Sequence, residues 1–174
     1  MRILGIDPGS RITGYGIIDI IDKKPIYIAS GCIKTLPANS LAERISIIAH
    51  DIVELIETYR PNAAAIEQVF VNVNPTSTLI LGQARGAAIA ALTLKNVPVF
   101  EYSALQIKQT VVGQGKAAKR QVQHMIMNML HLSSSPQADA ADALATAITH
   151  FLRNRLVVAN TQIVGRKIKG GRFI

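Results

Sequence analysis

Four acidic residues stand among small or apolar neighbours, where a carboxylate needs something to neutralise its charge. Asp7 closes a short apolar run, Glu67 follows four apolar residues, and Asp139 and Asp142 lie three apart in an alanine-rich segment. A spacing of three places both of these carboxylates on one face of a helix. If the four acids gathered, burial and mutual repulsion would raise their pKa values. The pattern therefore favours a bound cation.

The donor set indicates which cation. Only carboxylate oxygens are offered, with no cysteine pair and no histidines at ligand spacing, so Mg²⁺ or Mn²⁺ is favoured over Zn²⁺. Four carboxylates suffice for two such ions about 3.5–4 Å apart, one to activate a water and the other to stabilise the leaving oxygen of a phosphodiester. We expect two Mg²⁺ ions per subunit, with Mn²⁺ able to substitute, and phosphodiester hydrolysis.

Each acid also has an ordinary structural explanation. Asp7 can belong to a simple Asp-Pro-Gly turn, and Glu67 can pair with an arginine at a sheet edge. Asp139 can be a negative charge that favours a helix N-terminus. These alternatives stay open for each residue alone. The four acids together, beside a basic half of the chain, favour a metal site.

The excess of basic over acidic residues lies entirely in the second part of the chain. Residues 1–101 contain nine basic and nine acidic residues, whereas residues 102–174 contain ten basic residues and only two acids. Such a distribution is typical of a polyanion-binding face. A lysine near the scissile phosphate would stabilise its developing charge, and one further away would hold the backbone without reading sequence. The candidates lie in an acid-free stretch and are Lys108, Lys116, Lys119 and Arg120, for which a solvated helix face is the alternative.

Phe70 is the one aromatic residue close to a candidate acid in sequence, three residues after Glu67. Beside a metal site it would stack on a base or unpair it. A core position is equally compatible with the sequence.

The elements that must position these residues follow from hydrophobic periodicity and turn residues. Ser40 and Glu43 have capping-box spacing and predict a helix start, and Arg60-Pro61 predicts its end. We predict strands over 2–7, 14–21, 26–35, 62–68 and 98–102, and helices over 40–60, 77–96, 103–112, 117–131 and 137–154. Three antiparallel strands followed by alternating helices and strands imply an α/β fold with one mixed five-stranded sheet and helices on both faces. Asp19 alternates with apolar neighbours in its strand and is expected to face solvent. Gly82 and Gly86 lie four apart in the second helix and would permit a close backbone approach to another element.

Two further expectations concern organisation and location. Residues 1–155 are expected to form one domain, followed by a basic, flexible tail over 156–174. The N-terminus lacks the pattern of a secretory signal, no run of residues is uninterruptedly apolar enough for a membrane span, and Cys32 is the only cysteine. We therefore expect a cytoplasmic protein without a membrane partner.

Four separated motifs resemble the RuvC-type Holliday junction resolvases of the RNase H-like superfamily. They occur in the order of that family and cover residues 1–155 in a chain of the right length. One segment departs from the family pattern, since residues 71–84 contain no Lys or Arg. The motifs are GIDPGSRITGYG (5–16), AIEQVFVNVNPTSTLILGQARGA (65–87), EYSALQIKQTVVGQGKAAKRQVQHMI (101–126) and PQADAADALATAITH (136–150).

The resemblance implies a structure-selective endonuclease of bacterial recombination and DNA repair that nicks opposed strands of a four-way junction as a homodimer. It implies that the four acids bind two Mg²⁺ ions, that Lys108 and Lys119 assist at the scissile phosphate, and that Phe70 disturbs base pairing at the junction centre. Lys116 and Arg120 are expected to contact DNA. A branch-migration helicase complex is the implied partner.

Three other functions share some of these features. A sugar-kinase- or actin-like ATPase also has a strand ending in an acid, but needs a second copy of the sheet. A single-domain ribonuclease would share the metal chemistry without needing a dimer. A junction-binding protein without catalysis would not need all four acids. A test for metal-dependent nicking separates the last of these from a nuclease.

Overall fold

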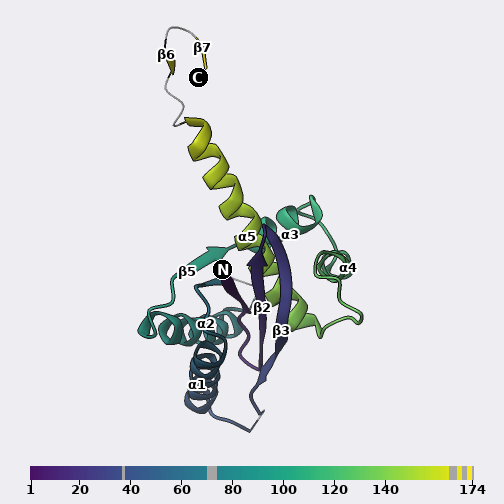
Figure 1. The fold of residues 1–174 in the computed structure, drawn as a ribbon. Coiled ribbons are helices and arrows are strands. Elements are labelled where there is room, and N and C mark those ends of the chain that lie inside the picture. Colours follow the sequence, from purple (N-terminus) through teal and green to yellow (C-terminus); the bar gives the residue numbers. More distant parts are fainter. Residues whose placement is uncertain (37, 70–73, 165–167, 170–171, 174) are drawn as a thin grey trace.

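A five-stranded mixed sheet forms the centre of the molecule (Figure 1). The computed structural model describes residues 1–36, 38–69, 74–164, 168–169 and 172–173, with side chains described as far as Asn154. The sheet order is β3-β2-β1-β4-β5. β2 pairs antiparallel with both β1 and β3, whereas β4 pairs parallel with both β1 and β5. This confirms the predicted sheet. Its strands are β1 (Arg2–Asp7), β2 (Ile12–Ile21), β3 (Lys24–Lys34), β4 (Ala63–Glu67) and β5 (Val99–Tyr102).

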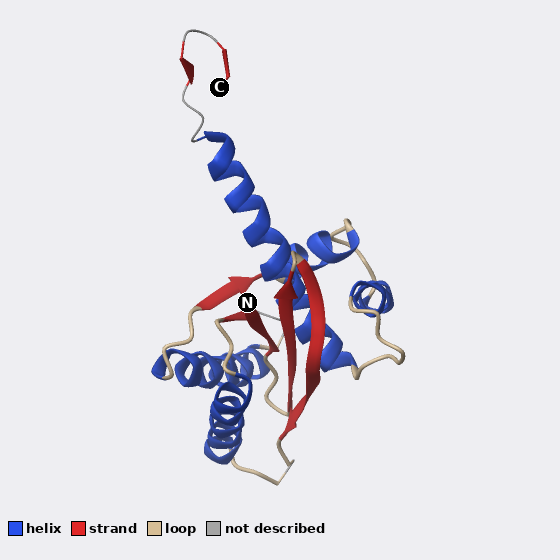
Figure 2. Cartoon of the chain, viewed as in Figure 1, coloured by secondary structure: helices blue, strands red, loops and turns tan. Residues whose placement is uncertain are grey.

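Helices cover both faces of the sheet, as Figure 2 shows. On one face lie α1 (Leu41–Tyr59) and α2 (Pro75–Leu94), and on the other α3 (Ala104–Val112), α4 (Lys119–Met129) and α5 (Ala138–Val164). The last helix runs to Val164 rather than to the predicted end near 154. A two-stranded piece follows, formed by β6 (Ile168–Lys169) and β7 (Arg172–Phe173). The domain boundary at 155 and the flexibility of the tail stay predictions.

Side-chain hydrogen bonds set two of the helix starts. Ser40 accepts from the Glu43 amide at 3.3 Å, and its own amide donates to the Glu43 carboxylate at 2.6 Å, which confirms the predicted capping box. α2 begins two residues earlier than predicted, because Asn74 caps it and Pro75 occupies its first turn. Proline suits this position, since its missing amide hydrogen would have no partner there.

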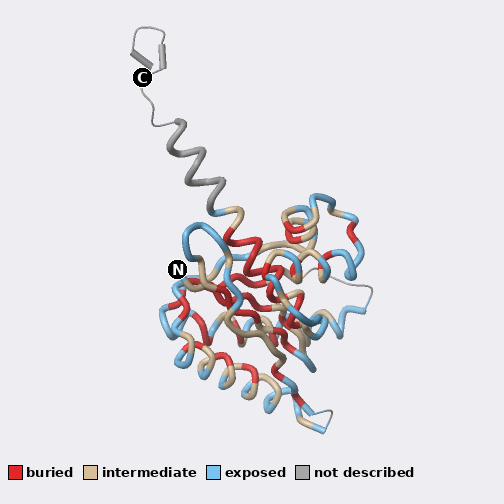
Figure 3. Tube along the Cα trace, turned by 45° about the vertical axis from the view of Figure 1, so that its right-hand side comes forward, coloured by how far each residue is buried: buried red, intermediate tan, exposed pale blue. Residues whose placement is uncertain are grey.

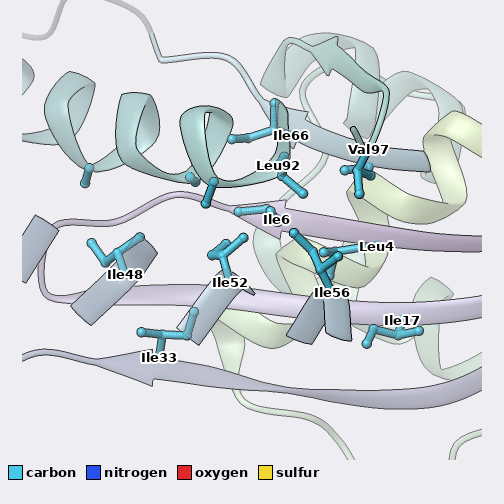
Figure 4. Close-up of a cluster of buried hydrophobic side chains, with 14 residues drawn as sticks. Leu4, Ile6, Ile17, Ile33, Ile48, Ile52, Ile56, Ile66, Leu92 and Val97 are labelled. Atoms are coloured by element: carbon cyan, nitrogen blue, oxygen red, sulfur yellow. The ribbon is translucent and has the colours of Figure 1, made fainter. Parts of the chain in front are cut away.

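Two apolar cores lie on opposite faces of the sheet, and burial is concentrated between the layers (Figure 3). Leu4 and Ile6 of β1 point toward α1 and α2, where Ile52 and Leu92 meet them (Figure 4). Ile3 points the other way, into the core formed with α5. This alternation is the period-two pattern of a strand buried on both faces.

Glycines in β1 and β2 let the backbone of α5 lie directly on the sheet. A Cβ atom at Gly5 would come within 2.0 Å of the Ala143 carbonyl oxygen, and one at Gly14 within 2.0 Å of the Asp139 carbonyl oxygen. A Cβ at Gly16 would meet Leu144 at 2.7 Å. Real side chains cannot occupy such positions, so the missing Cβ atoms set how close the acid-bearing helix comes to Asp7.

One smaller prediction is corrected. Asp19 does not simply face solvent, because both of its carboxylate oxygens accept from Arg2, at 2.9 and 2.7 Å. The close approach predicted at Gly82 and Gly86 involves none of the described residues of this chain, since an added Cβ at either would meet nothing within 4 Å.

α2 is, among the described residues, the one helix that is long and apolar enough by composition to cross a membrane. In this fold it is a component of the domain, because Ala84, Ala88 and Leu92 are buried in the core that it shares with α1 and the sheet. The outer side of α2 exposes Leu79 and Leu94 together with glycines and polar residues such as Gln83 and Thr93.

Candidate active site

Asp7 and Glu67 stand side by side at the carboxyl ends of two parallel strands. β1 and β4 pair in register up to Ile6 and Ile66, so the next residue of each strand is the acid. Because Ile6 and Ile66 are buried toward α1 and α2, strand alternation turns both acids toward the face that α5 covers. The strand pairing thus brings together two carboxylates that are sixty residues apart in sequence.

Both acids line one pocket of about 150 Å³ with a third acid and two lysines. Asp142 contributes from the first turns of α5, Lys108 from α3 and Lys119 from the start of α4. The remaining walls are apolar and come from Ala104, Ile107 and Val122. Five of the predicted functional residues therefore meet in one place, and they come from five different elements.

The acids perturb one another. Burial, followed by the charges of Glu67, Asp142 and Asp139, raises the pKa of Asp7 to about 8. Burial and the charge of Asp142 also raise the pKa of Glu67. Such values mark carboxylates that are not stable as a group of anions without a cation.

The protein without metal is expected to lose stability as the pH rises from about 4 to about 8. Folded Asp7 keeps its proton up to about pH 8, whereas the unfolded chain releases it near the ordinary value of 3.8. The folded state then binds more protons in this range, so the free energy of unfolding falls with rising pH. Asp7→Asn removes this effect and should stabilise the protein by a few kcal/mol at pH 8, since one pKa unit corresponds to about 1.4 kcal/mol. Urea unfolding of the parent and of Asp7→Asn in EDTA, at pH 4 and at pH 8, measures this difference in stability. If the variant is stabilised equally at both pH values, the raised pKa does not belong to Asp7.

Lys119 already partly compensates the cluster. Its ammonium lies 3.2 Å from a carboxylate oxygen of Asp142, and the lysine side chain is 78% exposed whereas that of Asp142 is 21% exposed. The charge of Asp142 raises the pKa of Lys119. The lysine therefore reaches from solvent onto the acid cluster at the mouth of the pocket.

Asp139 lies close to this pocket without lining it. Its charge contributes to the raised pKa of Asp7, and its carbonyl oxygen packs against Gly14. The structure thus brings three of the four predicted acids into one pocket and places the fourth beside them.

The donor chemistry fits a hard divalent cation, since the acids supply only oxygen and their charges raise the pKa of Asp7. In the part of the chain that the structure describes, no three Asp, Glu, His or Cys side chains are close enough together to hold an ion as they stand. Metal binding would therefore need small side-chain movements that draw the carboxylates inward. Asp7, Glu67 and Asp142 are the residues placed to make them.

The remaining predicted residues lie outside the pocket. Lys116 and Arg120 are exposed near the start of α4, where they flank Lys119. Phe70 lies outside the described residues. A second hollow of about 250 Å³ opens from Asp7 and Glu67 toward Ser77 and Thr78 at the start of α2, so the acids can be reached from two sides.

A larger pocket than the one at the acids lies elsewhere. It measures about 920 Å³ and runs between β3 and the loop before α5, where Lys34 and Ala140 are among its lining residues. No acid lines it, so size does not identify the reactive site here. The clustered acids and their perturbed pKa values do.

The sequence did not identify Arg85 as a site residue. The Arg85 side chain donates from Nε to the main-chain oxygen of Glu67 at 3.2 Å and also pairs with Glu101. The sequence feature that could have indicated Arg85 is that it is the one charged residue between Gln68 and Leu94.

Comparisons with known proteins show the family to which this chain belongs. The family model described as crossover junction endodeoxyribonuclease RuvC matches residues 3–150. This chain belongs to the RuvC family of crossover junction endodeoxyribonucleases. The RuvC enzyme of Neisseria meningitidis serogroup C is 61% identical over 173 residues, which are 99% of this chain and 97% of that protein. The predicted family resemblance is confirmed.

Solved RuvC structures share the fold. A Thermus thermophilus RuvC structure has a TM-score of 0.83 at 34% identity, covering 90% of this chain and 97% of that one. The Thermus thermophilus RuvC in complex with a Holliday junction substrate has a TM-score of 0.85 at 33% identity, over 90% of this chain and 96% of that one. The RuvC family fold and the endonuclease class predicted from sequence are confirmed, and the family implies dependence on a divalent metal.

Proposed function

We propose that this RuvC family member resolves four-way DNA junctions by paired symmetric nicks, with Asp7, Glu67, Asp139 and Asp142 holding two Mg²⁺ ions in each subunit of a homodimer. The observation that carries the proposal is the pocket in which three carboxylates and two lysines converge at the ends of two parallel strands. The likeness to a RuvC structure with a Holliday junction substrate supports the choice of substrate.

In the proposed reaction, the carboxylates Asp7, Glu67 and Asp142 orient the reacting groups. A bound divalent cation would supply Lewis acidity toward the phosphodiester and the attacking water. Lys119 and Lys108 stand at the wall of the same pocket and stabilise the charge that develops on the phosphate oxygens. The apolar residues Ile107 and Val122 limit water beside the acids, which strengthens these electrostatic contacts.

The direct test uses purified protein and three labelled DNAs: a four-way junction with a mobile core, a plain duplex and an RNA–DNA hybrid. Each is incubated with Mg²⁺, with Ca²⁺ and with chelator. We expect symmetric nicks in the junction with Mg²⁺ alone. Cutting of the hybrid instead would assign the protein to the ribonucleases, and junction binding without cutting would make it a structural partner.

Lys119→Ala is expected to slow cleavage by about 10²-fold, with little change in junction affinity, because it removes one donor from the pocket rather than a peripheral phosphate contact. Single-turnover rates and junction titrations measure the two effects. The matched control is Lys116→Ala, an exposed lysine outside the pocket. It should weaken binding, reduce the salt slope by about 1 and leave the rate at saturation unchanged. A pure binding defect in Lys119→Ala would move that residue to the peripheral group.

The outer face of α2 supports the proposed homodimer. Gly82 and Gly86 are exposed with open space around them, and Leu79 is 68% exposed. Glycine in an exposed helix costs about 1 kcal/mol relative to alanine, so two glycines one turn apart need another reason to be there. Close packing against a helix of a second copy supplies one, and a twofold dimer suits a junction with near-twofold symmetry.

Gly86→Glu is expected to convert the dimer to a monomer, because it places a charge and five heavy side-chain atoms where the second helix must approach. Light scattering coupled to size-exclusion chromatography measures the mass. Ser46→Glu, an exposed small-to-acid change on α1, is the control and should leave the mass unchanged. A Gly86→Glu protein that remains dimeric would place the dimer contact elsewhere.

We further propose a cytoplasmic location and a functional association with a branch-migration helicase complex, in accord with the family's role on DNA. Phe70 is proposed to disturb base pairing at the junction centre, and Lys116 and Arg120 to bind the DNA backbone. Exposure of the two basic residues beside Lys119 supports the second of these roles.

A further inference from the structure

We propose that Arg85 is a positioning residue that fixes the metal-ligand acid Glu67 from helix α2. The inference rests on the proposed function, because it concerns how the acid cluster is kept ready for metal. Arg85 does not touch the pocket and is not a catalytic residue. It acts on the main chain that carries Glu67.

The guanidinium of Arg85 joins three elements. Its Nε donates to the main-chain oxygen of Glu67 at 3.2 Å, and its Nη2 pairs with the Glu101 carboxylate on β5. The arginine side chain is 21% exposed. A planar guanidinium can satisfy both partners in fixed directions, which a flexible ammonium cannot do.

The end of β4 is thereby held from two sides. On one side the amide of Gln68, the next residue, donates to the Tyr102 oxygen of β5 at 2.9 Å. On the other side Arg85 donates to the Glu67 oxygen and is itself held by Glu101. Without Arg85, the last carbonyl of the strand loses this donor, and the Glu67 side chain starts from a less defined backbone position.

This fixation matters because the acids must draw together to hold an ion. No three of them are close enough as they stand within the described residues, so each carboxylate needs a well-placed backbone from which to move. Groups that orient a metal ligand without binding metal typically change affinity by about 10–100-fold when removed. Arg85 has the contacts of such a group.

The experiment measures Mn²⁺ binding by electron paramagnetic resonance on the full-length protein, together with single-turnover junction cleavage over a range of Mn²⁺ concentrations. Arg85→Gln is expected to raise the Mn²⁺ dissociation constant by about 10-fold. Its cleavage rate should fall at low Mn²⁺ and recover at high Mn²⁺, while junction affinity in Ca²⁺ stays unchanged. A general loss of structure would not be rescued by metal.

Two further variants sharpen the test. Arg85→Lys keeps the charge but not the planar fork, so it should restore metal binding only in part. Glu101→Gln changes a side chain that is 44% exposed and leaves the Arg85 bond to Glu67 possible, so it should fold and bind Mn²⁺ slightly more weakly. The control is Lys95→Gln, which removes another ion pair of the α2 region, to Glu57 at 2.7 Å, and should bind Mn²⁺ normally.

The outcomes separate this inference from the proposed function. If the parent protein neither binds Mn²⁺ nor cuts the junction, the proposed function fails. If the parent does both and Arg85→Gln binds Mn²⁺ equally well, the positioning role is overturned. Should Arg85→Gln not fold, normal Mn²⁺ binding by Glu101→Gln and Arg85→Lys overturns it instead.

Discussion

Asp7→Asn is expected to abolish junction cleavage while the variant binds the junction as tightly as the parent or more tightly. Asp7 lies in the acid cluster, where burial and then the charges of all three other acids raise its pKa. The change removes a metal ligand, so the rate should fall by at least about 100-fold, the upper range for losing groups that merely support a ligand. Above about pH 8, where Asp7 ionises in the absence of metal, the change also removes a negative charge that repels the DNA backbone.

The comparison that makes this result specific is Asp19→Asn. Asp19 is also a strand aspartate, but Arg2 occupies both of its oxygens and it lies outside the acid pocket. Its replacement should leave the cleavage rate unchanged. Single-turnover assays in Mg²⁺ and junction titrations in Ca²⁺ measure both variants. Normal cleavage by Asp7→Asn would show that the site is wrongly assigned.

Gly5→Ala is expected to destabilise the fold strongly by adding a single methyl group. The added Cβ would lie 2.0 Å from the Ala143 carbonyl oxygen and 2.8 Å from the Ala147 amide nitrogen, both of them backbone atoms of α5. Backbone cannot rotate away as a side chain does, so the helix must shift. We expect a loss of about 3 kcal/mol or more, at the upper end of the range for overpacked cores. Urea unfolding measures it.

Gly115→Ala provides the matched control. Its added Cβ would meet Leu105 Cδ1 at 2.3 Å, but Leu105 is 54% exposed and its side chain can move aside. This variant should lose little stability. If Gly5→Ala unfolds at the same urea concentration as the parent, α5 is not held against β1 as closely as described. A folded Gly5→Ala protein should also cleave more slowly, because the displaced helix carries Asp142 away from Asp7.

Much of the site could be predicted from residue types alone. A carboxylate at the end of an apolar strand has few stable surroundings, and Asp7 and Glu67 both stand in that position. Their strand ends, the Ser40 capping box and the element order follow from periodicity and capping, which act over a few neighbouring residues. These local rules were sufficient for the sheet and for three acids of one pocket.

The structure also changed details that local rules do not govern. Asp19 was expected to face solvent, but Arg2 reaches it from the neighbouring strand. Gly82 and Gly86 were expected to let another element approach, and among the described residues of this chain none does. The contact at Asp19 depends on a residue of another strand, which the pattern of neighbouring residues does not specify.

The sequence by itself therefore determined the chemistry: which acids and lysines are available, on which kinds of element, and for which class of cation. Only the tertiary structure decided their arrangement. It brought Asp142 and Lys119 together at 3.2 Å, left Asp139 beside the pocket rather than in it, and joined Arg85 to Glu67. The physical reason is that local periodicity specifies the direction of a side chain, whereas the distance between elements depends on how their backbones pack, as at Gly5 and Gly14 against α5.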